Sequence, residues 1–171
     1  MGNSGSGKTT IGRALAAALG APFVELDSIY HQRNWEPLPA DEFLDRVRVA
    51  TAGDTWVVDG NYSAVRSLVW ERADAVVWFD LRRATVMRQL LGRTLRRAAG
   101  RVELWNGNRE RWRNVFSRDP KESVIAWGWH NHDRYHEQFT AAAGDPQWSH
   151  LSFHRIRSRR DVRHLLQGAA N

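Results

Sequence analysis

Hydrophobic and polar positions along this chain follow two different periods in turn, which predicts a succession of strands and helices. Four short apolar runs predict strands, at residues 22–27, 55–59, 73–81 and 150–158. The run at 73–81, ADAVVWFDL, is almost continuously apolar, as expected for an interior parallel strand. Segments with helical periodicity separate these runs, so the pattern predicts an α/β architecture.

Apolar positions at helical spacing predict helices at residues 9–19, 41–52, 64–72, 83–98, 122–142 and 160–167. In the second of these, Phe43, Val47 and Ala50 form one stripe and acidic residues occupy the first turn. Neither period holds from Gly100 to about Pro120, where we expect a mobile segment. No internal repeat or inter-domain linker is visible, so residues 1–171 are predicted to form a single domain.

A phosphate-binding motif leads into the first predicted helix. Gly2-Asn3-Ser4-Gly5-Ser6-Gly7-Lys8-Thr9 matches G-x-x-x-x-G-K-[ST], the P-loop, and Thr10 follows it. The glycines allow a turn that aims backbone N–H groups at phosphate oxygens at the start of a helix. Lys8 is expected to reach the β- and γ-phosphates, and Thr9 to place its hydroxyl on Mg²⁺. The motif therefore predicts ATP and Mg²⁺ as cofactors, with residues 2–10 binding ATP.

Two aspartates follow predicted strands and are candidates for a second group near the metal. Asp59 comes directly after Trp56-Val57-Val58, and we expect it to hold Mg²⁺ through water, although it could instead cap the next turn. Asp80 also ends a strand, but it lies within Phe79-Asp80-Leu81-Arg82-Arg83, where a structural role is expected.

Three arginines on the predicted helix at 83–98 are candidates for stabilising charge on a transferring phosphoryl group. The spacing of Arg93 and Arg97 places both on one face, whereas Arg88 lies off to one side. The alternative is a basic helix face that only contacts solvent. We expect Arg88, Arg93 and Arg97 to act in catalysis, together with Lys8.

Asp27, at the end of the first predicted strand, bears on the nature of the phosphoryl acceptor. If a hydroxyl group attacks, this carboxylate could orient it or take its proton. If a phosphate attacks, the acceptor is already an anion and needs arginines rather than a base. Asp27 could also simply bond to the backbone of its loop.

Composition narrows the classes of function. The formal net charge is +6, mostly from arginine, which favours a phosphate-rich partner such as a nucleotide or nucleic acid. The absence of cysteine excludes disulfides and thiolate chemistry. No run of apolar residues is long enough for a membrane span and no signal segment is visible, so we expect a cytoplasmic protein without a membrane partner.

Several stretches together resemble one protein family. They are GNSGSGKTT, ELDSIYHQRNWEP, WVVDGNYS and ADAVVWFDLRR, followed by the arginine-rich helix. They resemble bacterial DNA topology modulation or FlaR-like proteins, which are similar to adenylate kinases in the nucleoside-monophosphate-kinase branch of P-loop proteins. The resemblance covers the chain from Gly2 to about Phe139. Its most specific parts are Leu26-Asp27 with Trp35-Glu36-Pro37, and Asp59-Gly60-Asn61-Tyr62-Ser63.

The resemblance implies a three-layer P-loop NTPase fold with a parallel sheet of order 2-3-1-4-5. It implies an acceptor-binding segment at about 30–52, a lid at about 98–118, and adenine packing near Arg157. In adenylate kinases the third strand ends in Asp-Gly-Phe/Tyr-Pro-Arg, whose arginine binds the acceptor phosphate. Here Asn61-Tyr62-Ser63 replaces the second half of that motif, and Arg66 lies one turn later.

The first strand of that sheet order is missing from the sequence, because only Met1 precedes the P-loop. That strand would be the central one, so the strands at Val57 and Val77 are expected to face each other across a gap. Unpaired buried backbone is costly. We therefore expect the natural gene to start roughly five to eight residues earlier, with an apolar β-branched run of strand length. The alternative is a fold with an incomplete sheet.

Three functions follow from these observations. The first is phosphoryl transfer from Mg·ATP to a nucleoside monophosphate. The second keeps the kinase but takes a small hydroxylated metabolite as acceptor, with Asp27 as base. The third is a nucleotide-dependent regulator or a nucleic-acid-associated protein, which is disfavoured because the sequence has neither a long basic tail nor a DNA-reading motif.

Overall fold

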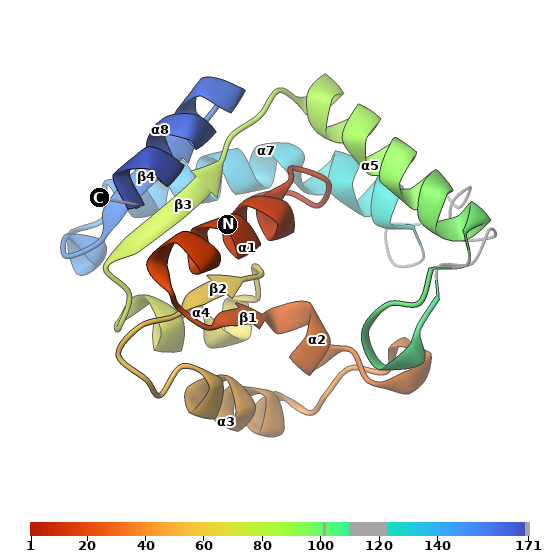
Figure 1. Ribbon diagram of the computed structural model, residues 1–171, viewed down its shortest axis with the longest axis horizontal. Coiled ribbons are helices and arrows are strands. Elements are labelled where there is room, and N and C mark those ends of the chain that lie inside the picture. Colours follow the sequence, from red (N-terminus) through yellow and green to blue (C-terminus); the bar gives the residue numbers. More distant parts are fainter. Residues whose placement is uncertain (101, 110–122, 170–171) are drawn as a thin grey trace.

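The computed structural model describes residues 1–100, 102–109 and 123–169 (Figure 1). The strands are β1 (Phe23–Glu25), β2 (Val57–Asp59), β3 (Ala75–Phe79) and β4 (Ser152–Ile156). The helices are α1 (Lys8–Leu19), α2 (Leu26–Tyr30), α3 (Ala40–Ala50), α4 (Ser63–Trp70), α5 (Arg83–Ala99), α7 (Val124–Ala143) and α8 (Arg159–Ala169). Short 3₁₀ turns are η1 (Arg33–Trp35), η2 (Trp105–Gly107) and η3 (Pro146–Trp148).

The strands form two parallel pairs. β1 pairs with β2, so that Glu25 lies opposite Asp59, and β3 pairs with β4, so that Phe79 lies opposite Ile156. In the described residues no strand ladder joins β2 to β3. With β1 to β4 as strands 2 to 5 of the predicted order 2-3-1-4-5, these are the two outer pairs that this order requires. No ladder among the described residues defines the order across the middle of the sheet.

A cavity of about 390 Å³ lies between β2 and β3 and is called here the inner groove. Residues 55–59 and 73–77 line its two sides, together with Ile11 and Leu15 of α1. Met1 lies at its end: the Met1 amino group donates a hydrogen bond to the Val77 oxygen at 2.6 Å, and the Phe79 N–H donates to the Met1 oxygen at 3.0 Å. The predicted gap between the strands at Val57 and Val77 is therefore confirmed.

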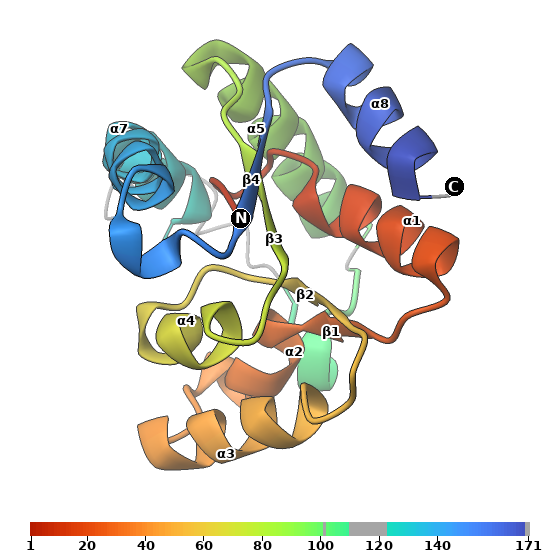
Figure 2. The same ribbon diagram turned by 90° about the vertical axis from the view of Figure 1, so that its left-hand side faces the viewer.

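Helices cover both faces of the β3–β4 pair, with α1 and α8 on one side and α4 and α7 on the other (Figure 2). The core lies mainly on the second side. Trp70 of α4, which is 1% exposed, packs against Phe139 of α7 and makes an edge contact with Trp148. Phe43 of α3 joins the same cluster. This packing gives the strand ends, where the candidate site lies, a rigid support.

The predicted elements are found, with shifted ends. The first predicted strand stops at Glu25, and Asp27 instead lies in the first turn of α2, where an acidic side chain is favoured. The predicted loop at 31–39 contains η1. Of the predicted lid, residues 101 and 110–118 lie outside the described residues. No described helix is both long and apolar enough to span a bilayer.

Candidate phosphate-binding site

The P-loop wraps around the carbonyl oxygen of Asn3. The Ser6 N–H and hydroxyl donate to this oxygen at 3.3 and 2.8 Å, and Lys8 Nζ donates to it at 2.8 Å. Asn3 is itself buried, and its Nδ2 donates to the Gly128 oxygen of α7 at 2.6 Å. A network of this kind holds the loop in one shape and places the Lys8 ammonium inside its curve.

The start of α1 exposes backbone donors at the P-loop. Gly7 is the N-cap residue, with φ 91°, so the loop turns into the helix through a left-handed conformation that suits glycine. The first N–H groups of any helix have no partner within the helix and attract anions. Here these groups belong to Lys8, Thr9 and the exposed Thr10. The backbone therefore fits the phosphates of a nucleotide.

Thr9 and Asp59 form the pair expected at a magnesium site. The Thr9 hydroxyl donates a hydrogen bond to Asp59 Oδ2 at 2.5 Å, although the two residues are 50 positions apart. Asp59 ends β2, and its side chain is mostly shielded from solvent. A hydroxyl and a carboxylate are oxygen ligands of the type that Mg²⁺ prefers. The donor set therefore fits this ion, either directly or through water.

The electrostatics of Lys8 show which charged groups gather around it. Burial lowers the pKa of Lys8, the carboxylates of Asp59 and Asp27 oppose this shift, and Arg93 adds to it. Each of these groups lies close enough to act on the ammonium. The structure therefore brings the predicted Lys8, Asp27, Asp59 and Arg93 to one site.

The three predicted arginines of α5 differ in their position relative to the P-loop. Arg93 Nη2 donates to the Ser4 hydroxyl at 2.9 Å, which places it on the P-loop. Arg97 lies one turn further along the same face and is half-buried. Arg88 is exposed and lies on the opposite side of the helix from Leu90, the residue that α5 packs against Gly5. The structure therefore does not bring Arg88 to the P-loop.

Asp27 and Tyr62 meet at the carboxyl ends of β1 and β2. The Tyr62 hydroxyl donates a hydrogen bond to Asp27 Oδ1 at 2.6 Å and lies 3.3 Å from His31 Nε2. Asp27 was predicted from the sequence as a candidate base, but no role was predicted for Tyr62 or His31. The sequence signals for Tyr62 were its place in Asp59-Gly60-Asn61-Tyr62-Ser63 and the departure of Asn61-Tyr62-Ser63 from the adenylate kinase motif.

The loops around η1 and η2 contact each other at this end of the site. Asn108, which is 3% exposed, accepts a hydrogen bond from the Trp35 N–H and donates to the Gln32 oxygen. Asn106 donates to the His31 oxygen, and the Trp105 ring stacks on the His31 ring at 6.0 Å between centroids. The described part of the predicted lid therefore contacts the start of the predicted acceptor-binding segment.

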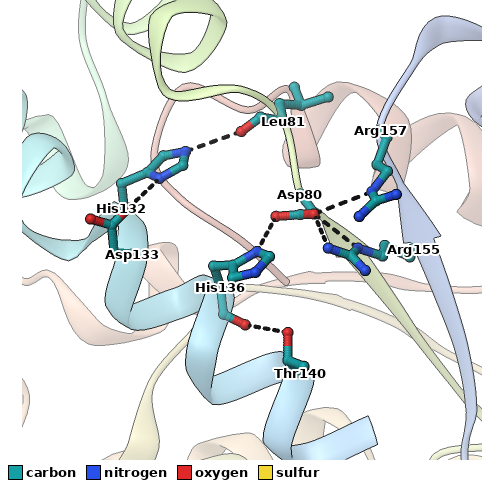
Figure 3. Close-up of polar contacts among 8 residues, drawn as sticks. All are labelled: Asp80, Leu81, His132, Asp133, His136, Thr140, Arg155 and Arg157. Carbon is teal, nitrogen blue, oxygen red and sulfur yellow. Dashed lines mark hydrogen bonds and ion pairs between the residues drawn. The ribbon is translucent and has the colours of Figure 1, made fainter.

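Arg157 lies at the carboxyl end of β4, next to a network built on Asp80 (Figure 3). Asp80 Oδ2 accepts hydrogen bonds from Arg155 Nε and Nη2 at 2.8 and 2.6 Å and from Arg157 Nε at 3.4 Å, while His136 Nδ1 lies 2.8 Å from Oδ1. Burial raises the pKa of Asp80, but His136 and Arg155 outweigh burial and leave the pKa below its usual value. Asp80 thus has the structural role that the sequence predicted.

Comparisons with known proteins find kinases that are similar to parts of this chain. The profile of the shikimate kinase family matches residues 4–47, which include most of the P-loop and Asp27. The shikimate kinase of Moorella thermoacetica (strain ATCC 39073 / JCM 9320) is 31% identical over an alignment of 104 residues that covers 52% of this chain. The chain spans 60% of the length of that curated relative.

Among solved structures, a gluconokinase from Sinorhizobium meliloti 1021 superposes with a TM-score of 0.54 at 21% identity, covering 99% of this chain and 89% of that one. These matches support neither the finer resemblance to FlaR-like proteins and nucleoside monophosphate kinases nor a nucleic-acid partner. The chain has the α/β fold of the P-loop kinases, with a parallel sheet.

Proposed function

We propose that this protein is an ATP-dependent kinase that phosphorylates a hydroxyl group of a small metabolite. The observation that carries the proposal is the position of Asp27 in the first turn of α2, directly after the strand whose last residue lies opposite Asp59. There its charge also opposes the fall in the pKa of Lys8, and Asp59 is bonded to Thr9. A carboxylate beside the phosphate site suits an acceptor that must lose a proton. The names of the matched proteins, shikimate kinase and gluconokinase, point to the same acceptor chemistry.

The roles of the residues follow from their positions. The backbone of residues 2–10 and Lys8 would bind the phosphates, and Thr9 and Asp59 would hold Mg²⁺. Arg157 would pack near the adenine, as the resemblance implies. Mg·ATP, when bound, supplies the phosphoryl group and the divalent charge that balances it. Arg93 and Arg97 add positive charge beside the P-loop.

Asp27 has the chemical role in this proposal. It accepts the proton of the acceptor hydroxyl while that oxygen forms its bond to the γ-phosphorus and the bond to the departing ADP breaks. The hydroxyl proton therefore ends on the carboxylate, and ADP leaves with its own negative charge balanced by the metal and arginines. Arg88 has no role here, because it lies on the far side of α5.

A coupled assay for ADP formation tests this proposal with two panels of acceptors. One contains hydroxylated acids, including shikimate and gluconate, and the other contains the common nucleoside monophosphates. We expect ADP formation with a member of the first panel and a loss of kcat of about 10²–10⁴-fold in Asp27→Asn, as for removal of a general base. Turnover with a monophosphate that persists in Asp27→Asn would contradict the proposal and favour a nucleotide kinase.

A further inference from the structure

The Tyr62 hydroxyl, which follows β2, lies between two side chains of the segment that follows β1, Asp27 and His31. Because Glu25 and Asp59 are opposite each other in the β1–β2 pair, the residues that follow them emerge side by side. Asp27 follows Glu25 by two positions and Tyr62 follows Asp59 by three. The hydroxyl therefore reaches Asp27 Oδ1 at 2.6 Å on one side and His31 Nε2 at 3.3 Å on the other.

The direction of these hydrogen bonds follows from the charges. Burial, together with the charge and the hydrogen bond of Asp27, raises the pKa of Tyr62 far above its usual value. The phenol therefore keeps its proton, and it donates that proton to the ionised carboxylate, the stronger acceptor. Tyr62 has only one O–H, so its contact with His31 requires an N–H donated by the imidazole.

This requirement fixes the tautomer of His31. Burial lowers the pKa of His31, against the opposing charge of Asp27, so the ring is neutral and carries one N–H. We assign that hydrogen to Nε2, which leaves Nδ1 as a bare acceptor. Nδ1 is buried and has no hydrogen-bond partner among the described residues, a situation that proteins tolerate better for an acceptor than for an N–H.

Aromatic packing holds the side chains of Tyr62 and His31 in place. The Tyr62 ring packs against Tyr30 and Phe43, with centroids 4.6 and 5.2 Å away. The His31 ring lies between Trp35 and Trp105, at 5.2 and 6.0 Å. Neither ring can turn without disturbing its neighbours, so the hydroxyl is fixed relative to the carboxylate.

We propose that Tyr62 is a positioning residue for Asp27, held in turn by His31. Its hydroxyl binds Oδ1 and stops the carboxylate from rotating, so that Oδ2 faces the acceptor hydroxyl. Among the described side chains none donates a hydrogen bond to Oδ2, which leaves that oxygen available. This inference rests on the proposed function, because it takes Asp27 as the group that receives the acceptor's proton.

The kinetic test compares Tyr62→Phe with Tyr135→Phe. Both remove one hydroxyl from a tyrosine that is half-buried, but among the described side chains the hydroxyl that bonds Asp27 is that of Tyr62, whereas Tyr135 of α7 bonds Asn61. We expect Tyr62→Phe to lower kcat by about 10–100-fold, as for a misplaced reacting group, with KM for ATP unchanged. Tyr135→Phe should change neither quantity by more than about twofold.

The double variant Asp27→Asn/Tyr62→Phe separates this inference from the proposed function. If Tyr62 acts through Asp27, the double variant is no slower than Asp27→Asn alone. A slow Asp27→Asn with a normal Tyr62→Phe overturns the positioning role and leaves the proposed function intact. A normal Asp27→Asn overturns the proposed function itself.

A measurement without substrate covers the case in which Tyr62→Phe fails to fold. Protein labelled with 3-fluorotyrosine gives a ¹⁹F resonance for each of the three tyrosines. We expect Asp27→Asn to move the Tyr62 resonance and to leave that of Tyr135 unchanged. A Tyr62 resonance that does not respond would show that the hydrogen bond is absent in solution, and would overturn the inference.

Discussion

At the scale of the residue, Gly5 shows how tightly the P-loop packs on its support. A Cβ added at Gly5 would lie 2.7 Å from Leu90 Cβ and 2.9 Å from Leu90 Cα, inside the contact distance. One added at Gly7 would meet nothing within 4 Å, although both glycines have positive φ, 81° and 91°. Both positions require a left-handed backbone, but only at position 5 must the residue also lack a side chain.

Gly5→Ala should therefore destabilise the protein more than Gly7→Ala. Both variants share the strain of alanine at positive φ, so the difference isolates the clash with the backbone of α5. We expect the free energy of unfolding, measured by urea denaturation, to fall by about 1–3 kcal/mol more in Gly5→Ala. Equal losses in the two variants would mean that the loop moves away from α5 at little cost.

Some contacts of the candidate site could be predicted from the sequence, and others could not. The contact between Thr9 and Asp59 could be predicted, because a P-loop threonine and a strand-end aspartate have fixed places in such folds. Tyr62 and His31 could not, because their roles depend on a ring orientation and a hydrogen bond between residues 31 positions apart. No local pattern encodes such a contact.

At the scale of the element, the Asp80 network joins α7 to the ends of β3 and β4 (Figure 3). Its partners come from different elements, His136 from α7 and Arg155 from β4. Because the pKa of Asp80 is lowered in the folded protein, its ionised form stabilises the fold. This contribution is complete above the pKa of the unfolded chain, about 3.9, and is lost as the pH falls through the lower folded value.

Asp80→Asn is accordingly expected to lower the free energy of unfolding by about 1–2 kcal/mol at pH 7. The difference from the unaltered protein should shrink at pH values below about 4. Asp45→Asn is the matched control, since Asp45 pairs with Arg48 within the exposed face of α3 alone. It should cost less than about 0.5 kcal/mol. A loss in Asp80→Asn that stayed constant down to pH 2 would argue against the ionised network.

Elements were predicted more reliably than their ends. The apolar run of β3 and the stripe on α3 were clear signals, and both elements are present. The end of β1 was placed two residues too late, because Leu26 is apolar and reads as strand although it is buried as the first residue of α2. The pairing of η1 with η2 through Asn108 joins residues 73 or more positions apart, beyond the reach of local periodicity.

At the scale of the whole molecule, the amino group of a chain that begins at Met1 links the inner groove to pH. Burial lowers the pKa of this group to about 5, with the charge of Lys8 adding to the shift and Asp59 opposing it. In the unfolded chain the pKa is near its usual value of 8.0. Between these values the unfolded chain binds more protons, so the free energy of unfolding should rise with pH from about 5 to 8.

Acetylation of the Met1 amino group tests this expectation. The acetylated chain keeps an N–H for the Val77 oxygen but cannot bind the proton, and the two forms share every histidine. We expect the slope of the unfolding free energy against pH to differ between the two forms between about pH 5 and 8. The difference should correspond to up to about one bound proton. Identical pH profiles would show that the amino group is solvated rather than buried.

The two inner edges of the sheet have a consequence for how molecules of this protein meet one another. Among the described residues no strand ladder pairs the backbone of β2 and β3 along the inner groove, and Met1 bonds only to Val77 and Phe79 of β3 there. Apolar side chains flank these edges. Such an edge is a template onto which an extended segment of a second molecule can add. We therefore expect self-association to begin at the groove, to an extent that depends on how firmly Met1 and α1 shield those edges.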